Sequence, residues 1–165
     1  MKQLILFFLA TFLLCSCIKE KQTGVDLVTG DVIPDFSIVL NDGSKLTNKD
    51  LAHGKSCIVF FTTACPDCKE TLPHIQKLYD EYSPKGVKFA IISREDGPEA
   101  VSKYWNEQKF TMPYSAQEDR KVYELFAKTR VPRVYVCNEG VIEAIFTDQP
   151  ENPTYDTLKK AIENL

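Results

Sequence analysis

The sequence predicts an α/β fold in which one mixed β-sheet carries helices on both faces. Two short apolar runs, CIVFFT at 57–62 and GVKFAIIS at 86–93, are typical of strands that are buried on both faces. Segments with helical periodicity follow each run, and a hairpin pattern with a last amphipathic segment closes the chain. The 165 residues are enough for one domain with a substantial core.

The first half of the domain is expected to contain a hairpin, a short helix, a buried strand and a long helix. Residues 35–47 surround an Asn-Asp-Gly turn signal, which predicts a β-hairpin, and residues 47–51 are expected to begin a short helix. Apolar residues spaced three and four apart predict a helix over 66–82. Pro66 suits the first turn of this helix, whereas Pro73 removes an interior hydrogen bond and predicts a kink.

The second half is expected to add two helices, a hairpin and a closing helix. Apolar spacing predicts helices over 98–108 and 118–128. Residues 131–137 and 141–146 read as strands joined across an Asn-Glu-Gly turn, and 153–165 read as an amphipathic helix. The predicted order is therefore β-β-α-β-α-β-α-α-β-β-α.

The N-terminus has the pattern of an export signal rather than of a folded segment. After Lys2 comes LILFFLATFLL, an apolar run of 11 residues that is too short to span a bilayer of about 30 Å. The following LCSC resembles a bacterial lipobox, with Leu14 at −3, Ser16 at −1 and Cys17 at +1. We expect a signal peptide over 1–16, a lipidated Cys17 and a polar tether over 17–30. An ordinary signal cleaved nearby, or an uncleaved anchor, is the alternative.

This signal predicts a membrane-anchored lipoprotein outside the bacterial cytoplasm, facing the periplasm, where disulfides persist. The globular domain is expected over 31–165 and contains four thiols, namely Cys57, Cys65, Cys68 and Cys137. The net charge of −3, with acids and bases interspersed, gives no basic surface for nucleic acid.

Cys65 and Cys68 form a CxxC motif between the strand at 57–62 and the helix at 66–82. A structural zinc site needs four ligands, and neither His53 nor His74 shows the spacing of a paired ligand, so we expect no metal. A purely structural disulfide across so short a loop would stabilise the fold little. A thiol at a helix N-terminus, by contrast, is favoured as the thiolate. The motif therefore predicts a dithiol in which Cys65 attacks and Cys68 resolves the mixed disulfide.

The strand–CxxC–helix unit, with Pro73 eight residues after Cys65, resembles the thioredoxin superfamily. TRVPRVYVCNEGVIEAIF, at 129–146, resembles its second hallmark, a proline that opens a strand before a hairpin. The segment at 33–61 and the inserted helix before FTMPYSAQED are similar to the TlpA/ResA-like extracytoplasmic thiol–disulfide oxidoreductases. The resemblance covers 31–165 and implies a cis Val131–Pro132 bond, with the Val131 backbone pairing with an extended substrate beside the dithiol.

Three positions depart from the family pattern. Ala64 stands where the family has Trp before the first cysteine, Thr71 where many reductant members have Glu, and Val59 where thioredoxin keeps a buried acid. Asp67 and Glu70 are then the nearest candidates for tuning the dithiol, although each can equally be a solvated helix charge. A carboxylate at Asp67 disfavours the thiolate, which predicts a moderately reducing couple.

The resemblance implies a thiol–disulfide oxidoreductase with no cofactor besides the redox-active Cys65–Cys68 disulfide. Its partners would be exported proteins with dithiols or disulfides, including apocytochromes as in cytochrome c biogenesis, and a membrane electron donor. We expect a monomer. Two alternatives are a thiol peroxidase, because Thr62 forms the T-x-x-C pattern of peroxiredoxins, and a non-catalytic binding lipoprotein. Against the first, Ile58 stands where a peroxiredoxin has proline; retention of the cysteines and Pro132 argues against the second.

Cys57 and Cys137 fall in predicted neighbouring strands, at the end of the sheet away from the motif. Burial as two small apolar residues is one interpretation, because free cysteine is among the most buried residue types. A second disulfide or redox pair, with the two thiols facing each other, is the other.

Overall fold

The computed structural model describes residues 26–165 of the protein and has the predicted order of elements. The elements are β1 (Ser37–Val39), β2 (Lys45–Thr47), α1 (Asn48–Leu51), β3 (Lys55–Phe61), α2 (Pro66–Tyr82), the 3-10 turn η1 (Ser83–Lys85), β4 (Lys88–Ser93), α3 (Pro98–Gln108), α4 (Lys121–Glu124), β5 (Arg133–Asn138), β6 (Val141–Thr147) and α5 (Tyr155–Glu163). The expected signal peptide and the expected lipidation site Cys17 lie outside the described residues. Within 26–165, no helix is both long and apolar enough to cross a membrane.

The central sheet has the strand order β4-β3-β5-β6 and is mixed, as predicted. Of the two inner strands, β3 runs parallel to β4 and antiparallel to β5, and β5 pairs antiparallel with β6. The predicted N-terminal hairpin is a separate two-stranded sheet of β1 and β2. Because β3 has neighbours on both sides, its end fixes the position of whatever follows it.

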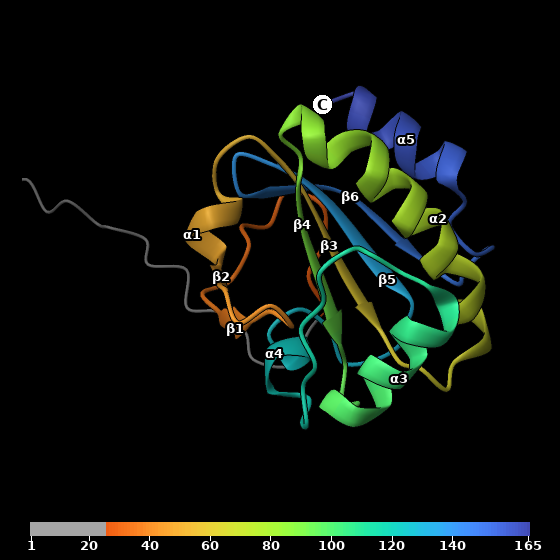
Figure 1. Ribbon diagram of the computed structural model, residues 1–165. Coiled ribbons are helices and arrows are strands. Elements are labelled where there is room, and N and C mark those ends of the chain that lie inside the picture. Colours follow the sequence, from red (N-terminus) through yellow and green to blue (C-terminus); the bar gives the residue numbers. More distant parts are fainter. Residues whose placement is uncertain (1–25) are drawn as a thin grey trace, which may run out of the picture.

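Helices cover both faces of the sheet, which gives the protein two apolar cores (Figure 1). Alternate residues of β3 serve each core: Val59 and Phe61 face the side of α2, α3 and α5, whereas Ile58 and Phe60 face the side of the hairpin, α1 and α4. The run at 57–62, predicted as a strand buried on both faces, is therefore confirmed, and the observed strand β3 covers residues 55–61. These observations establish the α/β, thioredoxin-like fold with its N-terminal hairpin and inserted helix α3.

The prediction of a helix over 118–128 is wrong in its length, since α4 covers only Lys121–Glu124. The amides of Leu125 and Phe126 bond three residues back instead of four, which tightens the chain and ends the α-helix. The Lys128 amide then donates to the side chain of Asp26, which lies outside this segment altogether. The apolar spacing reflected packing of this segment against the sheet, not a long helix.

Candidate active site

The end of β3 and the start of α2 together place Cys65. The strand ends at Phe61, a short turn follows, and Cys65 is the N-cap residue of α2 with Pro66 as the first helical residue. Cys65 is half-buried, and Cys68, inside the first turn, is fully buried. The predicted arrangement of one accessible and one enclosed thiol at a helix N-terminus is what the structure shows.

The loop before β5 brings Val131 to the dithiol. The Cys65 thiol donates to the Val131 carbonyl oxygen at an Sγ···O distance of 3.4 Å, across 66 residues of sequence. The Val131–Pro132 peptide bond is cis, which confirms the expectation from the resemblance. A second cis bond, Gln149–Pro150, was not anticipated. All four residues singled out by sequence at this point, Cys65, Cys68, Val131 and Pro132, thus lie in one place.

Burial dominates the electrostatics of Cys68. It raises the pKa of the Cys68 thiol well above its ordinary value, a hydrogen bond with the Thr62 backbone opposes this, and the Cys65 thiol and the Asp67 carboxylate raise the pKa further. The pKa of Tyr104 on α3 is also raised, first by burial and then by the charge of Cys68. At neutral pH, Cys68 is therefore a protonated thiol that needs a proton acceptor before it can react.

Asp67 and Glu70 share one partner that the sequence did not indicate. The side-chain amide of Asn152 donates to Asp67 Oδ1 and to Glu70 Oε2, each at 3.0 Å. Asn152 belongs to the loop between β6 and α5, so this loop is fastened to the first turn of α2. An asparagine between two prolines is typical of a turn, and no motif marks it as part of a site. The two carboxylates are thus bonded groups rather than free helix charges.

The three departures from the family pattern have distinct surroundings. Val59 is fully buried in the core beneath α2, so an apolar side chain fills the place of the buried acid. Thr71 is also fully buried, and among the described residues its hydroxyl has no hydrogen-bond partner. Ala64 is exposed, which leaves Cys65 without the aromatic cover that Trp would provide.

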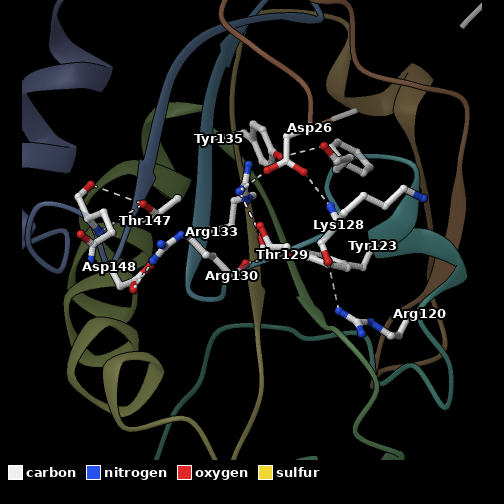
Figure 2. Close-up of polar contacts among 12 residues, drawn as sticks. Asp26, Arg120, Tyr123, Lys128, Thr129, Arg130, Arg133, Tyr135, Thr147 and Asp148 are labelled. Carbon is white, nitrogen blue, oxygen red and sulfur yellow. Dashed lines mark hydrogen bonds and ion pairs between the residues drawn. The ribbon is translucent and has the colours of Figure 1, made fainter. Parts of the chain in front are cut away.

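Two further contacts hold the loops around the dithiol. The Thr63 amide donates to Asp96 Oδ2 at 2.6 Å, which ties the turn before Cys65 to the segment after β4. Arg130, next to Val131, pairs with Asp148 Oδ2 at 2.9 Å and so joins this loop to the one after β6 (Figure 2). Asp96 and Asp148 were not recognised from sequence, because each partner is distant along the chain.

Cys57 and Cys137 do not face each other, so the hypothesis of a second redox pair is wrong. Cys57 lies opposite Val136 and belongs to the core beneath α2, whereas Cys137 lies opposite Ser56 and belongs to the other core. Both are fully buried free thiols. Burial and then the neighbouring Cys137 raise the pKa of Cys57, and burial raises that of Cys137 to about 12. The interpretation as small apolar residues is confirmed.

Across residues 26–165, His, Cys, Asp and Glu form no group of three or more that could hold a metal ion. The reactive groups that the structure brings together at the site are the Cys65 and Cys68 thiols and the Asp67 and Glu70 carboxylates. A half-buried thiol at a helix N-terminus, an enclosed thiol behind it and the half-buried backbone of Val131 beside it form a setting for thiol–disulfide exchange.

Comparison with known proteins agrees with this geometry. The Redoxin family model matches residues 28–162. The thiol-disulfide oxidoreductase ResA of Bacillus thuringiensis strain Al Hakam is 24% identical over 133 residues, covering 79% of this chain and 77% of that protein. The thioredoxin-like protein YneN of Bacillus subtilis is 26% identical over 130 residues, or 77% of this chain and 75% of that protein.

A solved structure, described as a putative protein disulfide isomerase from Bacteroides thetaiotaomicron, superposes with a TM-score of 0.74 at 20% identity, covering 84% of this chain and 87% of that one. This likeness shows the fold. The family match covers most of the described chain and includes both cysteines and Pro132. The chain belongs to the Redoxin family and is an oxidoreductase of the TlpA/ResA-like branch of the thioredoxin superfamily.

Proposed function

We propose that the protein reduces disulfides in exported proteins through the dithiol of Cys65 and Cys68. The observation that carries this proposal is the contact between Cys65 Sγ and the Val131 carbonyl at 3.4 Å. It places the accessible thiol beside a backbone edge to which an extended peptide can bind. The relatives named as thiol-disulfide oxidoreductases support the same reaction.

The reaction proceeds by two exchanges. The Cys65 thiolate attacks a substrate disulfide, so that a Cys65–substrate bond forms, the substrate S–S bond breaks and one substrate thiolate leaves. Cys68 then gives up its proton and attacks Cys65 Sγ, which releases the second substrate thiol and forms the Cys65–Cys68 disulfide. Two electrons have passed to the substrate, and a membrane dithiol donor returns the protein to the reduced state by the reverse exchange.

The surroundings of Cys68 assign a role to the carboxylates of the first turn. Because its pKa is raised mainly by burial, Cys68 reacts only after a proton has been removed. Asp67 and Glu70, both held by Asn152, are the acidic groups that we assign to tuning this step and the redox potential. Asp67 disfavours the Cys68 thiolate, which is consistent with a moderately reducing couple.

The location and the anchor belong to the same proposal. The lipobox-like LCSC motif supports lipidation of Cys17 and attachment to a bacterial membrane on its periplasmic side. A monomer tethered in this way would meet exported proteins, including apocytochromes, and a membrane electron donor. The domain has four thiols in a compartment where disulfides persist, which is consistent with a membrane electron donor that keeps the protein reduced.

The test is reduction of a disulfide-bonded protein such as insulin by the wild type, Cys65→Ser and Cys68→Ser, with Cys57→Ala as the control. Cys65→Ser should lower the rate by roughly three orders of magnitude, the scale expected for loss of a covalent nucleophile. Cys68→Ser should accumulate the mixed disulfide with substrate, visible as a covalent complex without reductant. Activity that does not depend on Cys65 contradicts the proposal, and peroxide reduction faster than disulfide reduction would favour the peroxidase.

A further inference from the structure

One carboxylate holds both ends of the loop that carries Val131. Asp26 Oδ1 accepts the Lys128 amide at 2.7 Å, and Asp26 Oδ2 accepts the Arg133 guanidinium at 2.7 Å (Figure 2). Lys128 stands before Val131 and Pro132, and Arg133 directly after them. A single side chain thus closes the loop of residues 128–133 at its base.

The ion pair of Asp26 and Arg133 is largely buried on the arginine side. The Arg133 side chain is only 6% exposed, and its guanidinium also donates to the Thr129 carbonyl at 3.1 Å. An arginine buried to this degree requires an anionic partner, because an uncompensated buried charge is strongly destabilising. Asp26 is the carboxylate that pairs with it. The position of Arg133, and with it the start of β5, is therefore tied to Asp26.

Hydrogen bonds from Tyr123 fix the middle of the loop, and the backbone of Arg130 in this loop is strained. The Tyr123 hydroxyl lies 2.5 Å from the Thr129 carbonyl oxygen and 2.8 Å from that of Arg130. Arg130 has a φ of 68°, in the left-handed region that non-glycine residues adopt rarely and at a cost in free energy. A strained residue directly before Val131 persists only where the surrounding contacts fix it.

Asp26 reaches this loop from a segment that lies outside the four-stranded sheet. Residues 26–33 form a strap, in which the Leu27 amide donates to the Phe126 carbonyl and the Gly30 amide to that of Ile142, each at 2.8 Å. The Ile33 amide donates to the Gly140 carbonyl at 2.9 Å. The strap is thus bonded to the structure on both sides of the loop, which gives Asp26 a fixed base.

We propose that Asp26 is a positioning residue for substrate binding, which acts through Arg133 and the Lys128 amide to hold the Val131 backbone facing Cys65. This inference rests on the proposed disulfide reduction, in which the substrate binds along Val131. A loop that is already ordered lets the peptide bind without the entropic cost of ordering the loop. Asp26 touches neither thiol, so its contribution concerns binding and not the chemistry of Cys65.

The test measures KM and kcat for a disulfide-bonded peptide with the full chain and its Asp26→Asn variant. Asp26→Asn should raise KM about tenfold, the scale of one hydrogen bond to a charged group, and leave kcat unchanged. The rate at which iodoacetamide alkylates Cys65 should also stay unchanged. Asp31→Asn is the matched control, because Asp31 lies in the same strap and its carboxylate, among residues 26–165, accepts only the nearby Val28 amide at 2.8 Å.

Hydrogen exchange of the amides in 128–133 gives a readout that needs no activity, and Asp26→Asn should accelerate it. If Asp26→Asn does not fold, the double variant Asp26→Ala with Arg133→Met replaces it, because it removes both charges of the pair together. This double variant should raise KM by the same factor of about ten. Unchanged exchange in 128–133, an unchanged KM, or an equal effect of Asp31→Asn would overturn the proposal. A wild type inactive toward disulfides would refute the proposed function, whereas the exchange result would still decide whether Asp26 holds the loop.

Discussion

Cys57 and Cys65, the two described cysteines that precede α2, differ in where the fold places them. Cys57 lies within β3, is fully buried and pairs across to β5, whereas Cys65 lies eight residues later, beyond the end of the strand and half-buried at the N-cap of α2. The partner of each differs as well. Cys68 lies directly behind Cys65, but Cys137 is on the opposite face of the sheet from Cys57.

From this difference we expect thiol reactivity in this protein to depend on position at the end of the strand and not on the number of thiols. At the strand end, the chain turns into a helix, and the turn leaves the Cys65 thiol accessible at the helix N-terminus. Inside the strand, the neighbouring strands and both cores exclude water, and burial favours the neutral thiol. The same residue type therefore serves chemistry at one end of β3 and packing at the other.

The largest expected effect is a difference in alkylation rate between Cys65 and the buried thiols of the reduced native protein. At pH 8, iodoacetamide should modify Cys65, whereas Cys57, Cys68 and Cys137 should react more than about a hundredfold more slowly, because each needs local opening of the structure. The pKa of each of these three thiols is raised by burial, so raising the pH from 7 to 9 should leave their labelling low. Mass spectrometry of digested protein measures each site.

Labelling in denaturant supplies the control for that experiment, since all the described thiols should then react alike. Labelling of Cys57 or Cys137 at a rate similar to Cys65 in the native state would contradict the comparison. So would a rise in Cys68 labelling over the same pH range, because the raised pKa keeps this thiol protonated there.

A smaller effect is expected on stability, where substitution of Cys57 should cost more free energy of unfolding than substitution of Cys65. Cys57→Ser places a hydroxyl in a fully apolar, water-free position and should lower the free energy of unfolding by about 2 kcal/mol. Cys65→Ser, at a half-buried N-cap where serine is a favoured residue, should change it by less than about 0.5 kcal/mol. Chemical denaturation of the reduced proteins measures both. An equal loss in the two variants would show that Cys57 is not the packing residue inferred here.

The sequence was sufficient for those parts of the site that depend on local order. A buried run, a CxxC motif and an amphipathic segment are consecutive, so the placement of Cys65 and Cys68 at the start of α2 followed from neighbouring residues. The position of Pro132 came from the family resemblance and not from local physics. The faces of Cys57 and Cys137 depended on register, because a shift of one residue between two strands moves a side chain to the other face.

Periodicity and motifs could not predict the contacts between segments that are distant along the chain. Asn152 meets Asp67 across 85 residues, and Asp26 meets Arg133 across 107 residues. In sequence, Asn152 has the character of a turn residue, and Asp26 falls within the range expected to be a polar tether. The structure shows that residues 26–30 already contact the domain. Their roles become visible only when the loops around the dithiol are assembled in space.

The smallest effect concerns the redox potential, where Asp67 and Glu70 form a matched pair on one asparagine. Asp67 raises the pKa of Cys68, so Asp67→Asn should lower that pKa. Because burial still keeps Cys68 protonated near neutral pH, the potential should move to more oxidising values by at most about 20 mV, equivalent to about 1 kcal/mol. Glu70→Gln loses the other hydrogen bond of Asn152 and should shift the potential less, because Glu70 is exposed and does not contribute to the shift at Cys68. Equilibration with glutathione at pH 7 and pH 8 measures both. The Asp67→Asn shift should stay small at both pH values, because burial keeps Cys68 protonated there. An equal shift in the two variants would assign the tuning to the Asn152 loop and not to the charge between the cysteines.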